Sequence, residues 1–425
     1  MYAIINPGSI DGSIKVPASK SMMQRACAAA LLHKGKTVIY NPGKSEDDKA
    51  ALRIIEQLGA TVTFVNNTIE ILSNGLNPAN EINCGESGLS ARLFTPIAAL
   101  CNTPITINGS GSLTRRPMDT IFKLLPQLGV SVSTENNRLP AILQGPLQVQ
   151  DISIDGSVSS QFLSGLLFAY TYAATSPVTI TVSNLKSKPY VDLTLDVLQK
   201  FGRVIRHDNY QSFYIDPANF TSQDEVHIII EGDWSSAAPL MAAAALAGKL
   251  KLYGLDLQSH QADKAILEVL QKSFANVTIT EEFIEVKKTT PLYPFEFDAT
   301  HYPDLFPAIA VLAACCHGES HIRGVHRLFY KESNRIVSIG DMLQALGIFF
   351  SIEDDDLVIE GQQRLDYATI DSYRDHRIVM AATAAALRAK GYVVITEAEA
   401  VSKSYPDFFA DLQSAGADIL LKDDN

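Results

Sequence analysis

A repeating unit of about seventy residues is the feature that most limits how this chain can fold. Six segments begin with polar residues and run directly into an Ala- or Leu-rich tract: ASKSMMQRACAAALL, GESGLSARLFTPIAAL, GSVSSQFLSGLLFAY, GDWSSAAPLMAAAAL, YPDLFPAIAVLAACC and YRDHRIVMAATAAAL. One marker residue in each segment gives spacings of 68, 71, 76, 69 and 72 residues: Lys20, Gly88, Ser159, Ser235, Asp304 and His376. Each segment predicts a helix with a polar start and a buried apolar body.

A second, amphipathic helix and a pair of short strands are expected after each of these helices. The second helices end at residues suited to a left-handed backbone, spaced by 70, 73, 74, 71 and 69 residues: Gly59, Gly129, Gly202, Asn276, Gly347 and Gly416. Alternating segments such as TVTFVNNTIEIL, NVTITEEFIEVKK and IFFSIEDDDLVIEG predict the strand pairs. Two series with one period predict an α/β protein built from six units.

The sixth unit lacks its return strand, and the N-terminal segments MYAIIN and GSIKVP are expected to supply it. This predicts two similar domains of three units each, residues 18–228 and residues 1–17 with 229–425. The chain would then cross between the domains near Val16 and near Ile229, which predicts a two-strand hinge. We expect the apolar first helices inside each domain, with their polar starts at one surface that faces the other domain.

Composition limits the partners and the cellular location. A net charge of −12 argues against a surface for nucleic acid or an anionic membrane, so any anionic ligand needs a local basic cluster. The five cysteines show no C-x-x-C spacing and are expected to be buried free thiols, which makes zinc and disulfides improbable. The N-terminal sequence lacks the layout of a signal peptide, and no long uncharged apolar run is present. We therefore expect a cytoplasmic protein. We also expect a monomer, because the repeats close into two self-contained domains with no obvious spare apolar face.

Basic, hydroxyl and acidic side chains gather at the predicted helix starts and in the loops beside them. Helix starts bind anions through free N–H groups and the helix dipole, and Arg and Lys add charge. Asp304 and Glu332 would be costly beside anionic substrates unless they move protons. The pattern therefore predicts an enzyme that acts on small, highly anionic molecules.

Each of these residues, considered alone, could have a structural role instead of a role in binding. Ser159 and Ser160 can cap a helix, Arg377 can pair with Asp375, and Arg335 can pair with Glu332 across a turn. The recurrence of such residues at equivalent places in six repeats favours a binding site.

Nine of these motifs, in order along the whole chain, resemble the 5-enolpyruvylshikimate-3-phosphate synthase family: ASKSMMQR, CGESGLSAR, SLTRRPM, SVSSQFL, SKPYVD, YPDLFP, KESNR, DHRIVMA and KSYPDFF. The resemblance implies the inside-out α/β fold of enolpyruvyl transferases, with two domains of three units. It also implies transfer of the enolpyruvyl group from phosphoenolpyruvate to the 5-hydroxyl of shikimate 3-phosphate, without a metal or an organic cofactor.

The resemblance also implies roles for individual residues. For shikimate 3-phosphate, Ser21 and Arg25 are expected at the carboxylate and Ser159, Ser160 and Ser187 at the phosphate, with the pocket completed by Lys20, Gln161, Tyr190, Asp304 and Lys331. For phosphoenolpyruvate, Lys20, Arg116 and Lys403 are expected at the phosphate and Arg335 and Arg377 at the carboxylate, with Gly88, Gln161 and His376 close by. Asp304 is expected to take the proton of the attacking hydroxyl, and Glu332, helped by Lys20, to protonate the methylene carbon.

Some positions depart from the family pattern, and two other functions fit parts of the sequence. Asn334, Phe329, Glu86 and Leu89 stand where the family commonly has Asp, a basic residue, Asn and Thr. UDP-N-acetylglucosamine enolpyruvyl transferase is the nearest alternative, but most of its members carry a Cys in the loop that here reads GSGSLTRRP. A non-catalytic repeat scaffold is the third possibility, and it would not need Asp304 and Glu332 beside basic residues.

Overall fold

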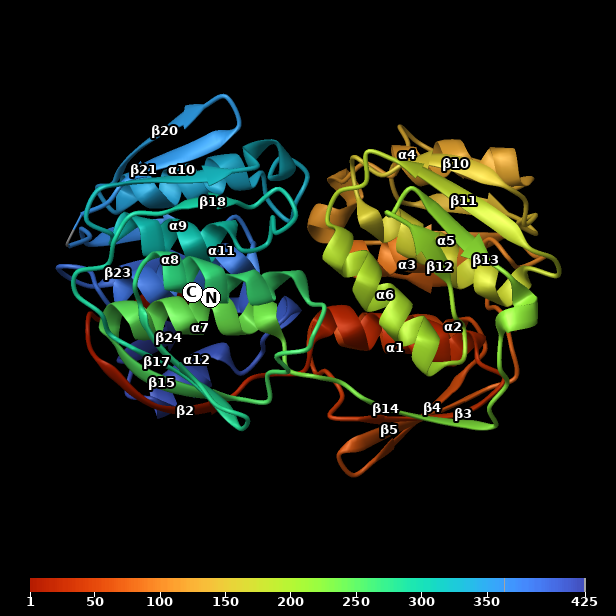
Figure 1. Cartoon of the computed structure of the whole chain (residues 1–425), viewed down its shortest axis with the longest axis horizontal. Coiled ribbons are helices and arrows are strands. Elements are labelled where there is room, and N and C mark those ends of the chain that lie inside the picture. The colour runs from red at the N-terminus through yellow and green to blue at the C-terminus, as the bar shows by residue number, and fades with distance from the viewer. Residues whose placement is uncertain (363, 424–425) are drawn as a thin grey trace. The chain divides into compact units, whose positions relative to one another are not determined.

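The computed structural model describes residues 1–362 and 364–423, and the chain divides into two compact units (Figure 1). Unit 1 comprises Met1–Pro17 and Gly232–Asn425, and unit 2 comprises Ala18–Glu231. The second boundary lies at 231/232, compared with 228/229 from the repeat pattern. Each unit has its own hydrophobic core.

Unit 2 contains three four-stranded sheets with one pattern of pairing, among the residues that the structure describes. In each sheet a parallel pair is followed by two antiparallel neighbours. The strand orders are β14 (Glu225–Ile229), β3 (Gly35–Tyr40), β5 (Thr68–Ser73), β4 (Thr61–Val65); β6 (Glu81–Asn83), β7 (Ile105–Asn108), β9 (Ala141–Gln144), β8 (Ser131–Thr134); and β10 (Ile152–Asp155), β11 (Val178–Ser183), β13 (Ser212–Ile215), β12 (Arg206–Asp208).

Unit 1 repeats this pattern in three further sheets over its described residues. The strand orders are β2 (Ile10–Lys15), β15 (Gly248–Tyr253), β17 (Phe283–Lys287), β16 (Asn276–Ile279); β18 (Glu296–Asp298), β19 (Glu319–Arg323), β21 (Asp356–Glu360), β20 (Phe349–Glu353); and β22 (Ala368–Asp371), β23 (Val393–Thr396), β1 (Tyr2–Ile5), β24 (Ile419–Lys422). The mixed α/β class expected from the repeats is therefore confirmed.

The N-terminal strand β1 fills the third position of the last sheet. It runs antiparallel to both neighbours, with Ala3 opposite Ile395 and Ile5 opposite Ile419. The next strand, β2, joins a different sheet and pairs in parallel with β15. Of the two N-terminal segments, MYAIIN is thus the one that completes the sixth repeat.

The Ala-rich helices lie at the centre of each unit, as the sequence predicts. They are α1 (Lys20–Leu32), α3 (Gly88–Ala98) and α5 (Ser160–Ala173) in unit 2, and α7 (Trp234–Ala247), α9 (Phe306–Ala314) and α11 (His376–Ala386) in unit 1. Within each unit the three helices contact one another (Figure 1). Every residue of α3, α9 and α11 is buried. Most of their side chains are apolar, and polar ones such as Thr95 and Thr383 bond to carbonyls of their own helix.

The second helix of each repeat is shorter or more amphipathic. These helices are α2 (Glu46–Gln57), α4 (Asp119–Leu124), α6 (Lys188–Lys200), α8 (Ile266–Lys272), α10 (Arg335–Ala345) and α12 (Phe408–Ser414). The five marker glycines that follow them have positive φ, as expected, but the prediction for Asn276 is wrong. Phe274 takes the left-handed conformation (φ 57°) instead, and Asn276 already begins β16.

Two further expectations concern the thiols and the membrane. Cys27, Cys84, Cys101, Cys315 and Cys316 are buried free thiols, as their apolar surroundings predict. Burial raises the pKa of Cys27, and it raises the pKa of Cys84 to about 12, so both thiols are unreactive. Among the described helices, none has the length and apolar character that crossing a bilayer requires.

Candidate active site

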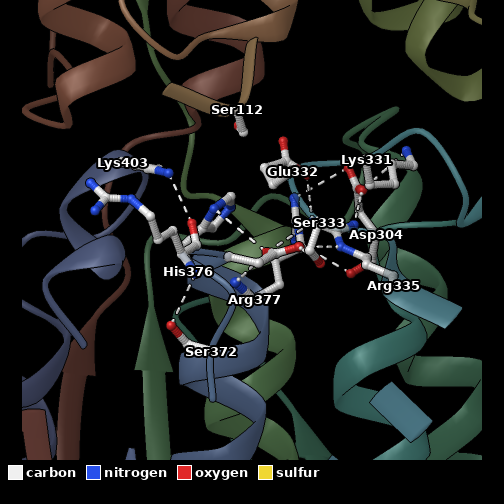
Figure 2. Close-up of polar contacts among 12 residues, drawn as sticks. Ser112, Asp304, Lys331, Glu332, Ser333, Arg335, Ser372, His376, Arg377 and Lys403 are labelled. Atoms are coloured by element: carbon white, nitrogen blue, oxygen red, sulfur yellow. Dashed lines mark hydrogen bonds and ion pairs between the residues drawn. The ribbon is translucent and has the colours of Figure 1, made fainter. Parts of the chain in front are cut away.

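A buried arginine organises the polar residues of unit 1. Arg335, the first residue of α10, is fully buried and contacts three carboxylates. Its Nη1 donates to Asp304 Oδ1 at 2.7 Å and its Nη2 to Glu332 Oε2 at 2.7 Å. Its Nε donates to Asp375 Oδ2 at 2.8 Å, and Ser333 also donates to that oxygen at 3.0 Å. The arrangement joins the residues preceding α9, α10 and α11 into one network (Figure 2).

Asp304 is the carboxylate with the most cationic neighbours in this network. Besides Arg335, Lys331 Nζ lies 3.3 Å from its Oδ1 and Arg377 Nη2 lies 3.3 Å from its Oδ2. Burial alone would raise the pKa of Asp304, but Arg377, Lys331 and Arg335 outweigh it and hold that pKa well below its ordinary value. Asp304 is therefore ionised at neutral pH and can accept a proton.

Burial has the opposite effect on the neighbouring amine. It lowers the pKa of Lys331 to about 8, although Asp304 favours the charged form. For Arg335, burial lowers the pKa, but Asp375, Glu332 and Asp304 together raise it well above its ordinary value. Arg335 therefore keeps its positive charge, whereas the charge of Lys331 depends on pH near pH 8.

Arg377 bridges two acids from α11. Its Nη1 lies 3.6 Å from Asp263 Oδ2, and its Nη2 contacts Asp304. Asp263 lies on the short 3₁₀ turn Ala262–Ala265, is 1% exposed, and accepts a hydrogen bond from Ser235 at the start of α7. Arg377, at the start of α11, therefore contacts the loop before α9 through Asp304. Through Asp263 it is also linked to Ser235 at the start of α7.

His376 and Lys403 lie on the same side of unit 1 as Arg377 (Figure 2). His376 is 2% exposed, and its Nδ1 lies 3.9 Å from Asp375 Oδ1. Lys403 ends the 3₁₀ segment Ala398–Lys403 and donates to the carbonyl of Arg374 at 2.8 Å. The seven site residues that the sequence assigns to unit 1 thus lie at helix starts or in the adjoining loops and turns: Asp304, Lys331, Glu332, Arg335, His376, Arg377 and Lys403.

In unit 2, the start of α1 is attached to two neighbouring helices. Ser19 caps α1, and Lys20 Nζ lies 2.9 Å from Asp47 Oδ2 in the first turn of α2. Arg25 is 1% exposed and donates from Nε to Thr194 Oγ1 at 2.8 Å. Its other nitrogens donate to the carbonyls of Ser21 (2.8 Å) and Tyr190 (3.0 Å), which fixes α1 against the first turns of α6.

The start of α3 is linked to both α1 and α5. Gln24 Oε1 accepts from Ser87 Oγ at 3.1 Å and from Ser90 Oγ at 2.8 Å. Arg92 Nη1 donates to the carbonyl of Gly88 at 3.3 Å and to Gln161 Oε1 at 3.2 Å. Both links bring helix starts of different repeats together.

Gly88 lets the guanidinium groups of two arginines lie close to the start of α3. A Cβ at this position would clash with the guanidinium of Arg116 and lie 2.8 Å from Arg92. The absence of a side chain therefore brings a backbone helix start and two cations together.

The serine residues assigned to a phosphate lie at the starts of α5 and α6. Ser159 caps α5 by accepting from the N–H of Gln161 at 3.2 Å, and Ser160 is 2% exposed. Ser187 precedes α6 with a left-handed backbone (φ 54°), which costs free energy in a residue that has a Cβ. Strain of this kind is more common at binding sites than elsewhere.

The structure separates the alternatives considered for three motifs. Ser159 does cap its helix, and Arg335 does pair with Glu332. Arg377 behaves differently, because its guanidinium contacts Asp304 and Asp263, while the carboxylate of Asp375 accepts from the backbone N–H of Arg377.

Two of the four departures from the family pattern have a local explanation. Asn334 caps α10 by accepting from the N–H of Ile336, a role that Asn and Asp fill equally well. Glu86 accepts from the N–H of Ser112 at 3.3 Å and so holds the loop that leads to Arg116. Leu89 is buried at the start of α3, and Phe329 is half exposed beside Tyr330.

The sequence did not single out four residues that the structure connects to the site: Gln24, Asp47, Thr194 and Asp263. Asp47 contacts Lys20, Thr194 contacts Arg25 and Asp263 contacts Arg377. Gln24 binds Ser87 and Ser90 on either side of Gly88. No sequence spacing indicates these contacts. Asp47 could have been noticed as an acid in the first turn of α2, and Asp263 as an acid in the turn that leads into α8, the second helix of its repeat.

By its fold, the chain belongs with the enolpyruvyl transferases. It matches EPSP synthase from Acinetobacter baumannii with a TM-score of 0.82 and 25% identity, covering 99% of this chain and 100% of that one. It also matches the enolpyruvyl transferase NikO from Streptomyces tendae with a TM-score of 0.79, covering 99% and 98% of the two chains. The identity to NikO is 19%, so this likeness concerns the fold alone.

Within that class, the chain belongs to the family described as EPSP synthase (3-phosphoshikimate 1-carboxyvinyltransferase), which it matches over residues 4–412. The 3-phosphoshikimate 1-carboxyvinyltransferase of Clostridium novyi is 34% identical, with 97% of each chain covered. That of Methanocella arvoryzae is 38% identical, covering 99% of this chain and all of the relative. The resemblance inferred from the nine motifs is thereby confirmed.

Proposed function

We propose that this chain transfers the enolpyruvyl group of phosphoenolpyruvate to the 5-hydroxyl of shikimate 3-phosphate and releases phosphate. Membership of the EPSP synthase family over nearly the whole chain is the observation that carries this proposal. The reaction places the enzyme in the shikimate pathway toward aromatic amino acids. Its substrates each carry a carboxylate and a phosphate, which fits the gathering of cations at the helix starts.

Unit 1 supplies the two acids of the proton chemistry in this proposal, and unit 2 supplies Lys20. Asp304 accepts the proton of the attacking hydroxyl, a role supported by its ionised state beside three cations. Glu332, helped by Lys20, delivers a proton to the methylene carbon. Protonation makes the adjacent carbon cationic, and the nearby carboxylates stabilise that charge as it develops.

Arg335 and Arg377 bind the carboxylate of phosphoenolpyruvate, and Lys20, Arg116 and Lys403 bind its phosphate. Both arginines contact carboxylates of the protein in the structure. The incoming carboxylate therefore exchanges with a protein carboxylate rather than meeting an unpaired guanidinium. Gly88 and His376 lie beside these cations in their own units and border the phosphoenolpyruvate.

Unit 2 supplies most of the site for shikimate 3-phosphate. Ser159, Ser160 and Ser187 donate to the phosphate, while Ser21 and Arg25 bind the carboxylate. Gln161 and Tyr190 complete this part, together with Lys331 of unit 1. The proposal requires that residues of both units act on the same pair of substrates, so that cations offset the repulsion between the two acids and hold the hydroxyl close to its target.

An assay of phosphate release tests the reaction and separates the alternatives. With phosphoenolpyruvate, we expect release when shikimate 3-phosphate is the acceptor and none when UDP-N-acetylglucosamine is. The opposite preference would support the UDP-N-acetylglucosamine enzyme, and no release with either acceptor would support a non-catalytic scaffold. We expect the rate to persist in a metal chelator, since the proposed chemistry uses only side chains.

We also propose that the enzyme is a monomer in the cytoplasm. Two self-contained cores and the small soluble substrates support this proposal. Sedimentation at the assay concentration tests the oligomeric state, and a mass of twice 46.2 kDa would contradict it.

A further inference from the structure

The carboxyl group of Asp263 is buried in unit 1 beside an arginine of the proposed site. It is 1% exposed and lies in the turn Ala262–Ala265, which packs against the start of α7. The Ser235 hydroxyl donates to its Oδ2, and Arg377 Nη1 lies 3.6 Å from the same oxygen. Arg377 is thus held between Asp263 and Asp304, one acid on each terminal nitrogen.

The two acids that share Arg377 have different surroundings. Asp304 contacts Arg335 at 2.7 Å and Lys331 at 3.3 Å in addition to Arg377. The charged groups with the largest effect on the pKa of Asp263 are Arg377 from α11, Asp304 from the loop before α9, and Asp233 at the start of α7. Among these groups Asp263 has one cation and two acids, whereas Asp304 has three cations and one acid, Glu332.

This asymmetry decides which acid takes a proton when negative charge arrives. Burial raises the pKa of Asp263 to about 6, against the opposing effect of Arg377. The pKa of Asp304 lies well below its ordinary value. An additional anion at Arg377 repels both carboxylates, and Asp263 is the one that protonates at lower cost.

A neighbouring residue already fixes the turn that carries Asp263. Gln261 accepts from the N–H of Trp234 at 3.0 Å and donates to the carbonyl of Gly232 at 2.8 Å. These two hydrogen bonds hold the turn on α7 in addition to the bond between Ser235 and Asp263. The carboxylate is available for a role at Arg377.

We propose that Asp263 is a positioning residue that holds Arg377 before substrate binds and takes up a proton when the phosphoenolpyruvate anion pairs with that guanidinium. The exchange keeps Arg377 ordered at all times and leaves Asp304 ionised as the base. It rests on the proposed function, because it takes phosphoenolpyruvate as the anion. Above the range in which Asp263 titrates, its carboxylate competes with the substrate for Arg377.

The test compares the KM for phosphoenolpyruvate of the wild type and of Asp263→Asn from pH 5 to pH 8. Asn resembles the protonated acid, so we expect similar KM values at pH 5. As pH rises, the wild-type KM should exceed that of the variant by a factor that grows to about tenfold, corresponding to one unit of pKa displacement. The titration of the substrate itself cancels in this ratio, and kcat should keep a constant ratio.

Two further variants distinguish positioning from a structural role. Ser235→Ala removes a hydrogen bond that favours the ionised acid, so the rise in relative KM should move to higher pH. Asp411→Asn is the control, because it removes a half-buried acid of α12 that accepts a hydrogen bond from Tyr405. Its KM should change with pH in parallel with the wild-type KM. Unfolding in urea checks that each variant is folded, and Ser235→Ala retains the carboxylate if Asp263→Asn is unstable.

The outcomes separate the two proposals. If the wild type turns over but the profiles of the wild type, Asp263→Asn and Ser235→Ala run parallel, the role of Asp263 is refuted while the reaction stands. If the wild type releases no phosphate with shikimate 3-phosphate, the proposed function itself fails.

Discussion

Arg335 of unit 1 and Arg25 of unit 2 are both almost completely buried, yet they are held by different kinds of partner. Three carboxylates surround Arg335, and they raise its pKa well above the ordinary value despite burial. Arg25 is held by the Thr194 hydroxyl and two backbone carbonyls, and burial lowers its pKa to about 10. One buried cation is balanced by acids and the other by neutral oxygens.

The different partners of these two arginines suit the two units to different steps of the proposed reaction. The positive charge of a cation that is balanced by acids is already offset before a substrate anion arrives, so binding the anion changes the electrostatic surroundings of those acids. A cation held by neutral oxygens keeps its positive charge for an arriving anion, at a cost in stability. The acid-rich network in unit 1 is suited to proton transfer, and the neutral one in unit 2 is suited to holding an anion.

The largest expected effect comes from removing the acid function in unit 1. Glu332→Gln keeps the size of the side chain but cannot supply a proton, so kcat should fall by about 10² to 10⁴-fold. Each KM should change much less than kcat. Steady-state kinetics measures both, with the exposed Glu319→Gln on β19 as a control. Equal losses in kcat and in substrate affinity would place Glu332 in a structural role.

The corresponding change in unit 2 should affect binding and stability. Arg25→Lys cannot donate to three separate oxygens, so the KM for shikimate 3-phosphate should rise by about ten- to a hundredfold. Buried oxygens left without donors should cost about 1 to 3 kcal/mol in the free energy of unfolding. Urea denaturation measures that cost, with the exposed Arg206→Lys as the matched control. Unchanged stability would contradict the account of Arg25.

The pH dependence should separate the two units further. Because burial lowers the pKa of Lys331 to about 8, its charge is present below that pH and disappears as pH rises through it. The KM for shikimate 3-phosphate should therefore increase above pH 8, by at most about tenfold per unit. Lys331→Arg stays charged and should have a flat KM between pH 7 and pH 9. A wild-type KM that is also flat would remove Lys331 from the binding site.

The smallest effect is expected at a departure from the family pattern. Asn334→Asp preserves the cap on α10, so kcat should stay within about twofold and the free energy of unfolding within about 0.5 kcal/mol. Asn334→Ala removes the cap and should cost about 1 kcal/mol. A large change in kcat for the Asp variant would show that this position contributes more than a helix cap.

The sequence predicted those parts of the molecule that depend on local patterns repeated along the chain. The Ala-rich helices, the strand pairs and the glycines after the second helices each follow from periodicity or backbone freedom within a few residues. The prediction for Asn276 failed because β16 begins at this residue, and the left-handed position lies two residues earlier, at Phe274.

The contacts between repeats could not be predicted in the same way. Arg377 could pair with Asp375 by sequence distance, but Asp375 is already bonded to Arg335, and Arg377 reaches Asp263 over more than a hundred residues. Likewise, nothing local to Arg25 indicates Thr194 as its partner. The partners of side chains at helix starts come from other repeats, and they become neighbours only when the unit has folded.

The place of β1 between β23 and β24 has a consequence for the order of folding. During synthesis, unit 2 is complete once residue 231 has emerged, and it can form its core while later residues are still being added. The first strand of the protein must wait for neighbours that the ribosome makes nearly four hundred residues later. Contacts of such long range form slowly, so closing the last sheet of unit 1 should be the late step in reaching the native state.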